Sequence, residues 1–126
     1  MIPSLKRGSQ AAIEAAKEAL ERYSRFWLGN PGKVESELYE LGLLSDGERY
    51  MAIDIALQEI SPACRLGPEP PHDLSSHPPF YRQSLYAFRW DSGHFGKMMY
   101  LKFALVSGSG GTRLALYSFH ESTERG

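Results

Sequence analysis

Apolar residues in the first part of the chain recur at the spacing of an amphipathic helix. From Gln10 to about Trp27 they lie three or four residues apart, and Ser9 is placed to cap the segment. Gly29 and Pro31 follow directly, and these two residue types end helices. The pattern predicts a first helix over about 10–27.

Two further helices are predicted before the middle of the chain. Pro31 suits the first position of a short helix over about 31–41. Ser45 and Glu48 form a capping-box pattern, in which each side chain accepts a backbone N–H of the other residue. A helix with an apolar stripe should therefore run from there to about Ile60.

The pattern changes in the second half of the chain. Residues 67–79 contain five prolines, which excludes a helix or a central strand there and predicts a surface loop. Residues 80–90, 97–106 and 113–120 are rich in aromatic and branched residues that alternate with polar ones, as in strands. Their connections are too short for parallel crossovers, so the strands should form an antiparallel meander.

These elements predict one α+β domain over residues 1–126. A helical part over about 9–66 precedes a proline-rich loop over 67–79 and a β meander over 80–121. Helices that precede strands in this way pack on one face of an antiparallel sheet. The length of 126 residues is usual for one domain with one core.

Composition narrows the class of protein. The single cysteine, Cys64, excludes an intrachain disulfide and a cysteine metal cluster, and the four histidines are not spaced like zinc ligands. We therefore expect no metal and no cofactor. No apolar stretch is long enough to span a bilayer or to act as a secretory signal, so we expect a cytoplasmic protein without membrane contact.

Charge is distributed unevenly between the two halves. Residues 1–60 hold seven Lys or Arg and ten Asp or Glu, whereas residues 61–126 hold seven and five. The second half is thus slightly basic, which is compatible with a polyanionic ligand but is more typical of ordinary scatter of surface charge.

Strand alternation predicts which residues share a face of the sheet. Leu101, Phe103 and Leu105 should face the helices, and Tyr100 and Lys102 should face the other way. The other two strands separate into these sets: Leu114, Leu116, Ser118 and His120 against Ala115, Tyr117 and Phe119; and Tyr81, Gln83, Leu85, Ala87 and Arg89 against Arg82, Ser84, Tyr86, Phe88 and Trp90. Sequence does not determine the register between strands. Which set of residues from each of these two strands shares the face of Tyr100 therefore stays open.

A polar sheet surface follows from this alternation. Its candidate members are Gln83, Arg82 or Arg89, Tyr100, Lys102 and His120. An exposed sheet face carries polar residues in any case, so the same set is also typical of a solvated surface without a function.

A series of short motifs occurs in a familiar order between residues 38 and 121. They are Leu41-Gly42-Leu43, Asp46-Gly47, a helix, Ile60-Ser61-Pro62-Ala63, Gln83-x-x-Tyr86, Tyr100-Leu101-Lys102 and Ser118-Phe119-x-Glu121. In order and spacing they resemble the MqsR (motility quorum-sensing regulator) toxins, whose pattern runs ELGLDFDG, a helix, LTPADFYKSM, WQDVYRP, VYLKL and VSFKE. The resemblance covers about two-thirds of the chain.

The resemblance implies a RelE-like fold and a ribosome-independent endoribonuclease, the toxin of a toxin–antitoxin pair that cuts mRNA. The active-site Gln of the family matches Gln83 and its Tyr matches Tyr100, whereas its C-terminal Lys is replaced by His120. The Arg of WQDVYRP falls on Ala87, and Arg89 follows two residues later on the same strand side. The Lys of FYKSM falls on Gly67, with Arg65 as the nearest cation.

The candidate residues also suit metal-free RNA cleavage on chemical grounds. The reaction needs a base for the 2′-hydroxyl, cations for the phosphorane and an acid for the leaving oxygen. Histidine changes charge near neutral pH, so His120 can be base or acid, and Lys102 with Arg82 or Arg89 can hold the phosphate. Tyr100 can donate a proton or position the ribose, and Gln83 can orient the phosphate.

Two functions therefore remain open for this surface. The first is a toxin-like, metal-independent endoribonuclease acting on single-stranded mRNA, with a cognate antitoxin protein as partner. The second is a catalytically inactive toxin relative, or a small adaptor that binds a protein on the same sheet face.

Overall fold

The computed structural model describes residues 8–68, 74–75, 83–108 and 110–123. Its helices are α1 (Ser9–Tyr23), α2 (Pro31–Glu40), α3 (Asp46–Glu59) and the short 3-10 helix η1 (Pro62–Cys64). Its strands are β1 (Trp27–Leu28), β2 (Arg65–Leu66), β3 (Tyr86–Ser92), β4 (Lys97–Gly108) and β5 (Gly111–Glu121). The α+β class predicted from sequence is confirmed.

Helix α1 is shorter than its sequence pattern predicts. Gly8 occupies the cap position, so Ser9 is the first helical residue and not the cap. The helix ends where Ser24 takes a left-handed conformation at φ 56°, and its N–H donates to the Leu20 carbonyl. Trp27 therefore lies in strand β1 and not in the helix.

Helices α2 and α3 begin where the sequence predicts. Asn30 occupies the cap position of α2, with Pro31 as its first residue. At α3 the Ser45 hydroxyl accepts the Glu48 N–H, and the Glu48 carboxylate accepts the Ser45 N–H. The backbone N–H groups of Ser45 and Leu44 both donate to this carboxylate and lower the pKa of the exposed Glu48 carboxyl from its ordinary value.

The sheet contains the predicted meander and one short strand at each edge. Its order is β1-β5-β4-β3-β2, in which β4 is antiparallel to both β3 and β5. Strand β1 pairs in parallel with β5, and β2 pairs antiparallel with β3. Strand β3 begins at Tyr86, so the strand predicted over 80–90 does not include residues 83–85. Residues 80–82 lie outside the described part.

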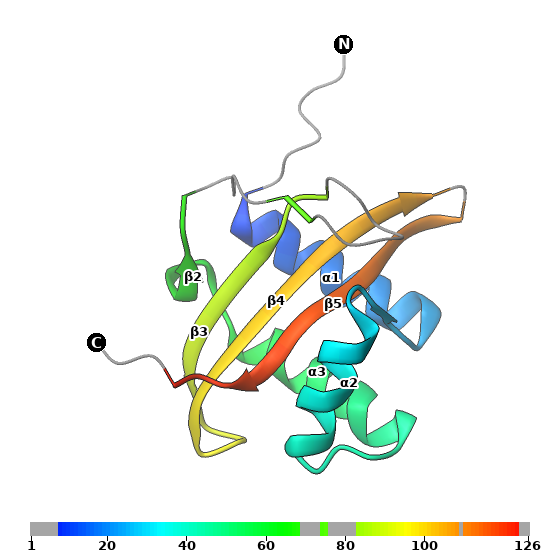
Figure 1. Ribbon diagram of the computed structural model, residues 1–126. Coiled ribbons are helices and arrows are strands. Elements are labelled where there is room, and N and C mark those ends of the chain that lie inside the picture. Colours follow the sequence, from blue (N-terminus) through cyan, green and yellow to red (C-terminus); the bar gives the residue numbers. More distant parts are fainter. Residues whose placement is uncertain (1–7, 69–73, 76–82, 109, 124–126) are drawn as a thin grey trace.

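The helices pack on the sheet through one main hydrophobic core. Figure 1 shows α1 and α3 on one face of the sheet and α2 beside the β5 edge. Helix α1 contributes Ala12, Ile13, Ala16, Ala19 and Leu20, and α3 contributes Ala52, Ile53, Ala56 and Leu57. Phe88, Phe103 and Phe119 from the three long strands lie beneath them and have no exposed surface.

A β-bulge in β5 changes the predicted alternation. Lys102 pairs with Ser118, but Phe103 pairs with Leu116, which leaves Tyr117 as an extra residue. Leu114 and Leu116 therefore share the core with Phe119, which the strict alternation had placed on the opposite side. Ser118 and His120 are moved to the other face of the sheet, together with Tyr117.

The face of the sheet away from α1 and α3, here called the second face, has two unlike halves. Near the β4–β5 hairpin it is apolar and contains Ala104, Ala115 and Tyr117, packed against Trp27, Leu85 and Val106. Beyond the bulge it carries Arg89, Tyr100, Lys102, Ser118 and His120, here called the polar half. The bulge lies at the boundary between the two halves.

In the part of the chain that the structure describes, no helix is both long enough and apolar enough to cross a membrane.

Candidate functional site

Three polar side chains from three neighbouring strands form a row on the second face. Arg89 of β3 pairs with Tyr100 of β4, and Tyr100 pairs with His120 of β5. Residues directly opposite each other in antiparallel strands point to the same face of the sheet. The next row contains Ala87, Lys102 and Ser118, so Lys102 lies beside this polar row. The structure thus brings together four of the predicted site residues.

The rings of Tyr100 and His120 lie against each other. Their centroids are 5.1 Å apart and their planes are inclined by 32°. The Nδ1 atom of His120 lies 2.8 Å from the Glu121 carbonyl oxygen. Because a carbonyl oxygen can only accept, Nδ1 must carry the proton, and in the neutral imidazole Nε2 keeps its lone pair. The structure therefore leaves Nε2 as the basic nitrogen.

Two charged side chains from α2 adjoin this row. The carboxylate oxygen Oε2 of Glu37 lies 4.0 Å from His120 Nε2 and 2.7 Å from Lys33 Nζ. Lys33 Nζ also donates to Ser118 Oγ. The Glu37 carboxylate thus adjoins both the imidazole of His120 and the ammonium of Lys33.

Lys33 and Glu37 also complete the hydrogen bonding of the outer edge of β5. Pairing between β1 and β5 ends with the Gly29 N–H donating to the Leu116 carbonyl. Farther along, Glu37 Oε1 accepts the Phe119 N–H at 2.9 Å, and Lys33 Nζ lies 3.4 Å from the Tyr117 carbonyl oxygen. These side chains take the place of a missing strand partner for buried backbone groups.

Sequence reasoning did not identify Lys33 and Glu37. Their spacing of four residues indicates a helix-surface ion pair, which is what they form. Their contacts with residues 117–120 join segments more than 80 residues apart. The pattern of neighbouring residues in the sequence does not predict a contact between segments so far apart.

Gln83 lies apart from the polar row. Its backbone N–H donates to Ser75 Oγ at 3.0 Å, and its carbonyl accepts the Ser75 N–H at 2.9 Å. It precedes Ala87, the partner of Lys102, by four residues, which is about 13 Å in an extended strand. The structure does not bring Gln83 together with Tyr100 and His120.

The predicted cations are divided between different places. Arg65 pairs with Phe88, a core-facing residue, so it lies on the other side of the sheet from the polar row. Its guanidinium donates to the Pro62 carbonyl at 3.2 Å. Arg89 belongs to the polar row itself, and Arg82 lies outside the described residues.

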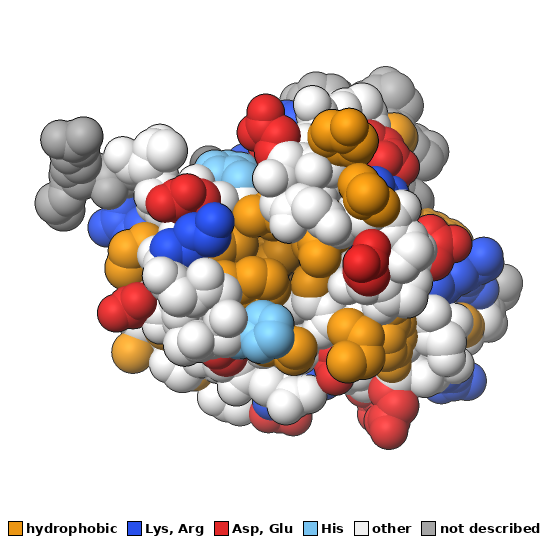
Figure 2. Space-filling model, turned by 90° about the horizontal axis from the view of Figure 1, so that it is seen from below, with side chains coloured by type: hydrophobic (Ala, Val, Ile, Leu, Met, Phe, Trp, Pro, Cys, Tyr) orange, Lys and Arg blue, Asp and Glu red, His pale blue; other side chains and the backbone are white. Residues whose placement is uncertain are grey.

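An apolar surface adjoins the end of the sheet at which the polar row lies. Figure 2 shows two histidine side chains at the border of a hollowed apolar area. The half-buried ring of Phe95 packs edge-on against His94 at 4.7 Å and against Phe119 at 5.5 Å between centroids. Phe119 directly precedes His120 in β5, so its ring points to the opposite face of the sheet, and this apolar surface belongs to the helix side and not to the polar half.

The described residues contain no group of three or more His, Cys, Asp or Glu side chains arranged to hold a metal ion. The polar half instead offers a histidine, a phenol and cationic side chains, which suit proton transfer and the binding of an anion.

Comparisons with family models, with curated proteins and with solved structures found no match to this chain.

Proposed function

We propose that this chain is a toxin-like, metal-independent endoribonuclease that cleaves single-stranded mRNA on the polar half of the second face. The observation that carries the proposal is the row of Arg89, Tyr100 and His120 across three adjacent strands, with Lys102 beside it. A base, a second proton-transfer group and two cations lie within one or two strand spacings of each other. This is the set of groups that phosphodiester cleavage through the 2′-hydroxyl requires.

In the proposed reaction, His120 Nε2 takes the proton of the ribose 2′-hydroxyl. The 2′-oxygen forms a bond to phosphorus, and the bond from phosphorus to the 5′-oxygen breaks. The Tyr100 hydroxyl donates a proton to the leaving 5′-oxygen, so the products are a 2′,3′-cyclic phosphate and a 5′-hydroxyl. The imidazolium then returns its proton to the phenolate through solvent.

The neighbouring side chains have defined parts in this proposal. Arg89 and Lys102 bind the phosphate oxygens, where negative charge increases as the phosphorane forms. Glu37 stabilises the imidazolium of His120 and holds α2 against β5. The resemblance to the MqsR toxins supports the role of Tyr100, which matches the active-site Tyr of that family. It also suggests a cytoplasmic protein with an antitoxin that covers this face.

The direct test is incubation of the purified chain with a long single-stranded RNA in EDTA. We expect cleavage by the wild type and by His94→Ala, since His94 is an exposed residue of the β3–β4 turn. His120→Gln should show almost none. Absence of cleavage by the wild type, or equal cleavage by His120→Gln, would overturn the proposed activity.

A second candidate function follows from the position of Gln83. The family matches an active-site Gln to this residue, yet it lies away from the polar row and bonds with Ser75. A chain that keeps the cationic row without this residue can bind RNA or a protein partner without cutting it. Binding of the same RNA by the wild type with no cleavage in EDTA would select this function over the first.

A further inference from the structure

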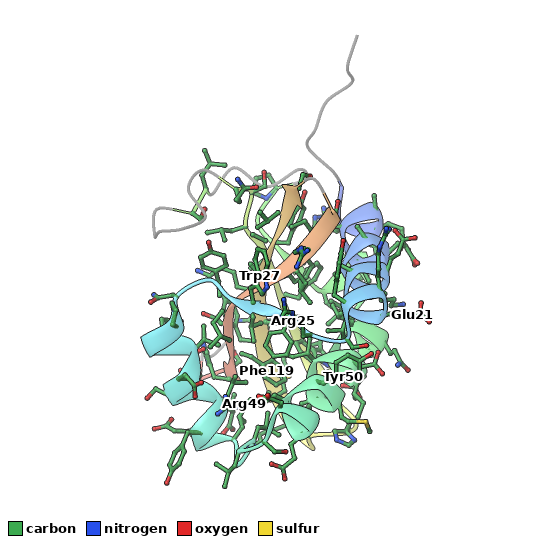
Figure 3. The ribbon with its side chains drawn as sticks, turned by 90° about the vertical axis from the view of Figure 1, so that its right-hand side faces the viewer. Glu21, Arg25, Trp27, Arg49, Tyr50 and Phe119 are labelled. Carbon is green, nitrogen blue, oxygen red and sulfur yellow. The ribbon has the colours of Figure 1, made fainter. Side chains whose placement is uncertain are left out.

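A cavity separate from the polar row lies between the segment that follows α1 and the helices α2 and α3. It has a volume of about 400 Å³, and its walls are Ser24, Arg25, Phe26, Leu28, Glu35, Asp46, Arg49 and Tyr50. Figure 3 shows Arg25 on the segment that leads from α1 into β1, and Arg49 and Tyr50 on α3. Its volume falls within the range of small-molecule sites, about 300–1,000 Å³.

The charged groups of this cavity differ in whether they already have a partner. Arg49 Nη1 lies 3.0 Å from Glu35 Oε2, and Arg49 Nε donates to the Leu43 carbonyl. In contrast, Arg25 and Asp46 form no side-chain hydrogen bond or ion pair with any described residue. One cation and one anion in the cavity wall are therefore available to a ligand.

The remaining wall supplies apolar contact. Phe26, Leu28 and Tyr50 are half-buried and pack against the main core, so each presents part of a ring or side chain to the cavity. Ligand sites of this kind combine apolar walls with a few charged groups that set orientation. The pair of unmatched charges selects a ligand with one anionic and one cationic group.

We propose that this cavity binds a small zwitterion with an apolar body, of the amino-acid or short-peptide class. Its carboxylate pairs with Arg25, its ammonium pairs with Asp46, and its apolar side chain lies against Phe26, Leu28 and Tyr50. Charge-assisted hydrogen bonds to both ends give the site its selectivity. The proposal does not depend on RNA cleavage, because none of these residues belongs to the polar row.

The charge separation of the ligand can be measured with a small panel. Phenylalanine carries both charges on one carbon, whereas the dipeptide phenylalanyl-leucine separates them by about 7 Å when extended. Isothermal titration of the full chain with both compounds identifies the better spacing. We expect saturable binding of at least one of them, and the absence of saturation by both at millimolar concentration would overturn the proposal.

Blocked forms of the better ligand test the role of each charge. We expect amidation of its carboxyl or acetylation of its amine to weaken binding by about tenfold or more, as for loss of a charged hydrogen bond. Arg25→Gln should bind the free and amidated forms equally, and Asp46→Asn should bind the free and acetylated forms equally. Arg22→Gln, outside the cavity, should keep the wild-type preferences.

Both variants are expected to fold, since Arg25 and Asp46 are exposed and Ser45 still caps α3. Thermal unfolding of each variant checks this point separately from binding. If the variants fold and still prefer the unblocked ligand as the wild type does, the assignment of Arg25 and Asp46 is wrong.

Discussion

The imidazole of His120 lies between the phenol ring of Tyr100 and the carboxylate of Glu37. The ring centroids are 5.1 Å apart, and Nε2 is 4.0 Å from Glu37 Oε2. These contacts come from β4 and α2, on opposite sides of β5. The proposed base, the proposed proton donor and the neighbouring carboxylate are therefore held by three different elements of the fold.

Loss of either proton-transfer group should lower the rate of RNA cleavage. We expect His120→Gln and Tyr100→Phe each to reduce the rate by about 10²-fold or more, the usual contribution of a general acid or base. Tyr100→Phe keeps the ring that packs on His120, so it removes only the hydroxyl. Single-turnover cleavage of a labelled RNA measures both variants, and an unchanged rate in Tyr100→Phe would exclude the phenol as the acid.

Glu37 should affect activity and stability in separable ways. Glu37→Gln keeps an oxygen for the Phe119 N–H and removes the charge, so we expect about tenfold slower cleavage with near-normal stability. Glu37→Ala also leaves the Phe119 N–H without its acceptor, which should cost about 1–3 kcal/mol of unfolding free energy. Urea unfolding and cleavage assays measure the two effects.

The control for Glu37 is Glu40→Gln, an exposed position on the same helix. It should change neither cleavage nor stability. Equal effects of the Glu37 and Glu40 substitutions on cleavage would show that α2 acts only through its overall charge.

Cations on the second face should determine affinity for RNA. Arg89→Gln and Lys102→Gln should each weaken binding of a single-stranded RNA and reduce the slope of log affinity against log salt by about 0.7. Arg65→Gln removes the same kind of charge from the other side of the sheet and should leave the slope unchanged. Fluorescence anisotropy over a salt series provides the measurement, and three equal slopes would contradict binding on the second face.

Glu59 should make stability fall in acid. Its carboxylate accepts hydrogen bonds from Trp90 Nε1, Ser92 Oγ and the His94 N–H, and so joins α3 to the β3–β4 hairpin. Burial raises the pKa of Glu59, but these hydrogen bonds and the charge of His94 outweigh it, so the pKa lies below the ordinary 4.5. The stabilisation is present above pH 4.5 and is lost as pH falls through the lower pKa of the folded state.

Glu59→Gln replaces an acceptor oxygen by a donor and should lower the unfolding free energy at pH 7 by about 1–3 kcal/mol. The difference from the wild type should shrink as the pH falls below 4.5 and through the lower pKa of the folded state. Urea unfolding across this pH range measures it, with Glu18→Gln on the exposed face of α1 as control. A difference independent of pH would show that the charge of Glu59 is not involved.

Gly29 should not tolerate a side chain. A Cβ atom there would lie 2.3 Å from the ring of Tyr117, which is itself buried on the second face. We expect Gly29→Ala to cost about 1–3 kcal/mol through overpacking. Gly32→Ala meets nothing within 4 Å in the first turn of α2 and should be neutral or slightly stabilising. Thermal unfolding of the two variants separates a steric effect from a general effect of losing glycine.

Features with a local cause could be predicted from sequence. Ser45 and Glu48 specify the start of α3 through neighbouring hydrogen bonds, and the alternation of β4 identifies its core face. Strands β1 and β2 were missed because two residues carry no periodicity. The spacing of Trp27 fits the helical pattern, so the sequence predicts a helix that includes it. The helix in fact ends before Ser24, whose left-handed conformation the spacing does not reveal.

Parts of the site were predictable and parts were not. Alternation within one strand predicts that Tyr100 and Lys102 share a face of the sheet. That Arg89 lies opposite Tyr100 on this face follows only once the register is known. The bulge at Tyr117 could not be predicted, since its sequence alternates like a regular strand. The contacts of Lys33 and Glu37 with β5 depend on how α2 packs on that strand, which is a property of tertiary structure alone.

The extra residue at Tyr117 has a consequence for how this chain can change in evolution. Deletion of one residue there would restore regular pairing and turn either Phe119 toward solvent or Leu114 and Leu116 out of the core. A single-residue deletion in β5 would therefore damage hydrophobic packing and the polar half in one event. Substitution at His120, in contrast, leaves the hydrophobic packing in place. We therefore expect the polar side chains of this surface to change in evolution by point substitution and not by deletion.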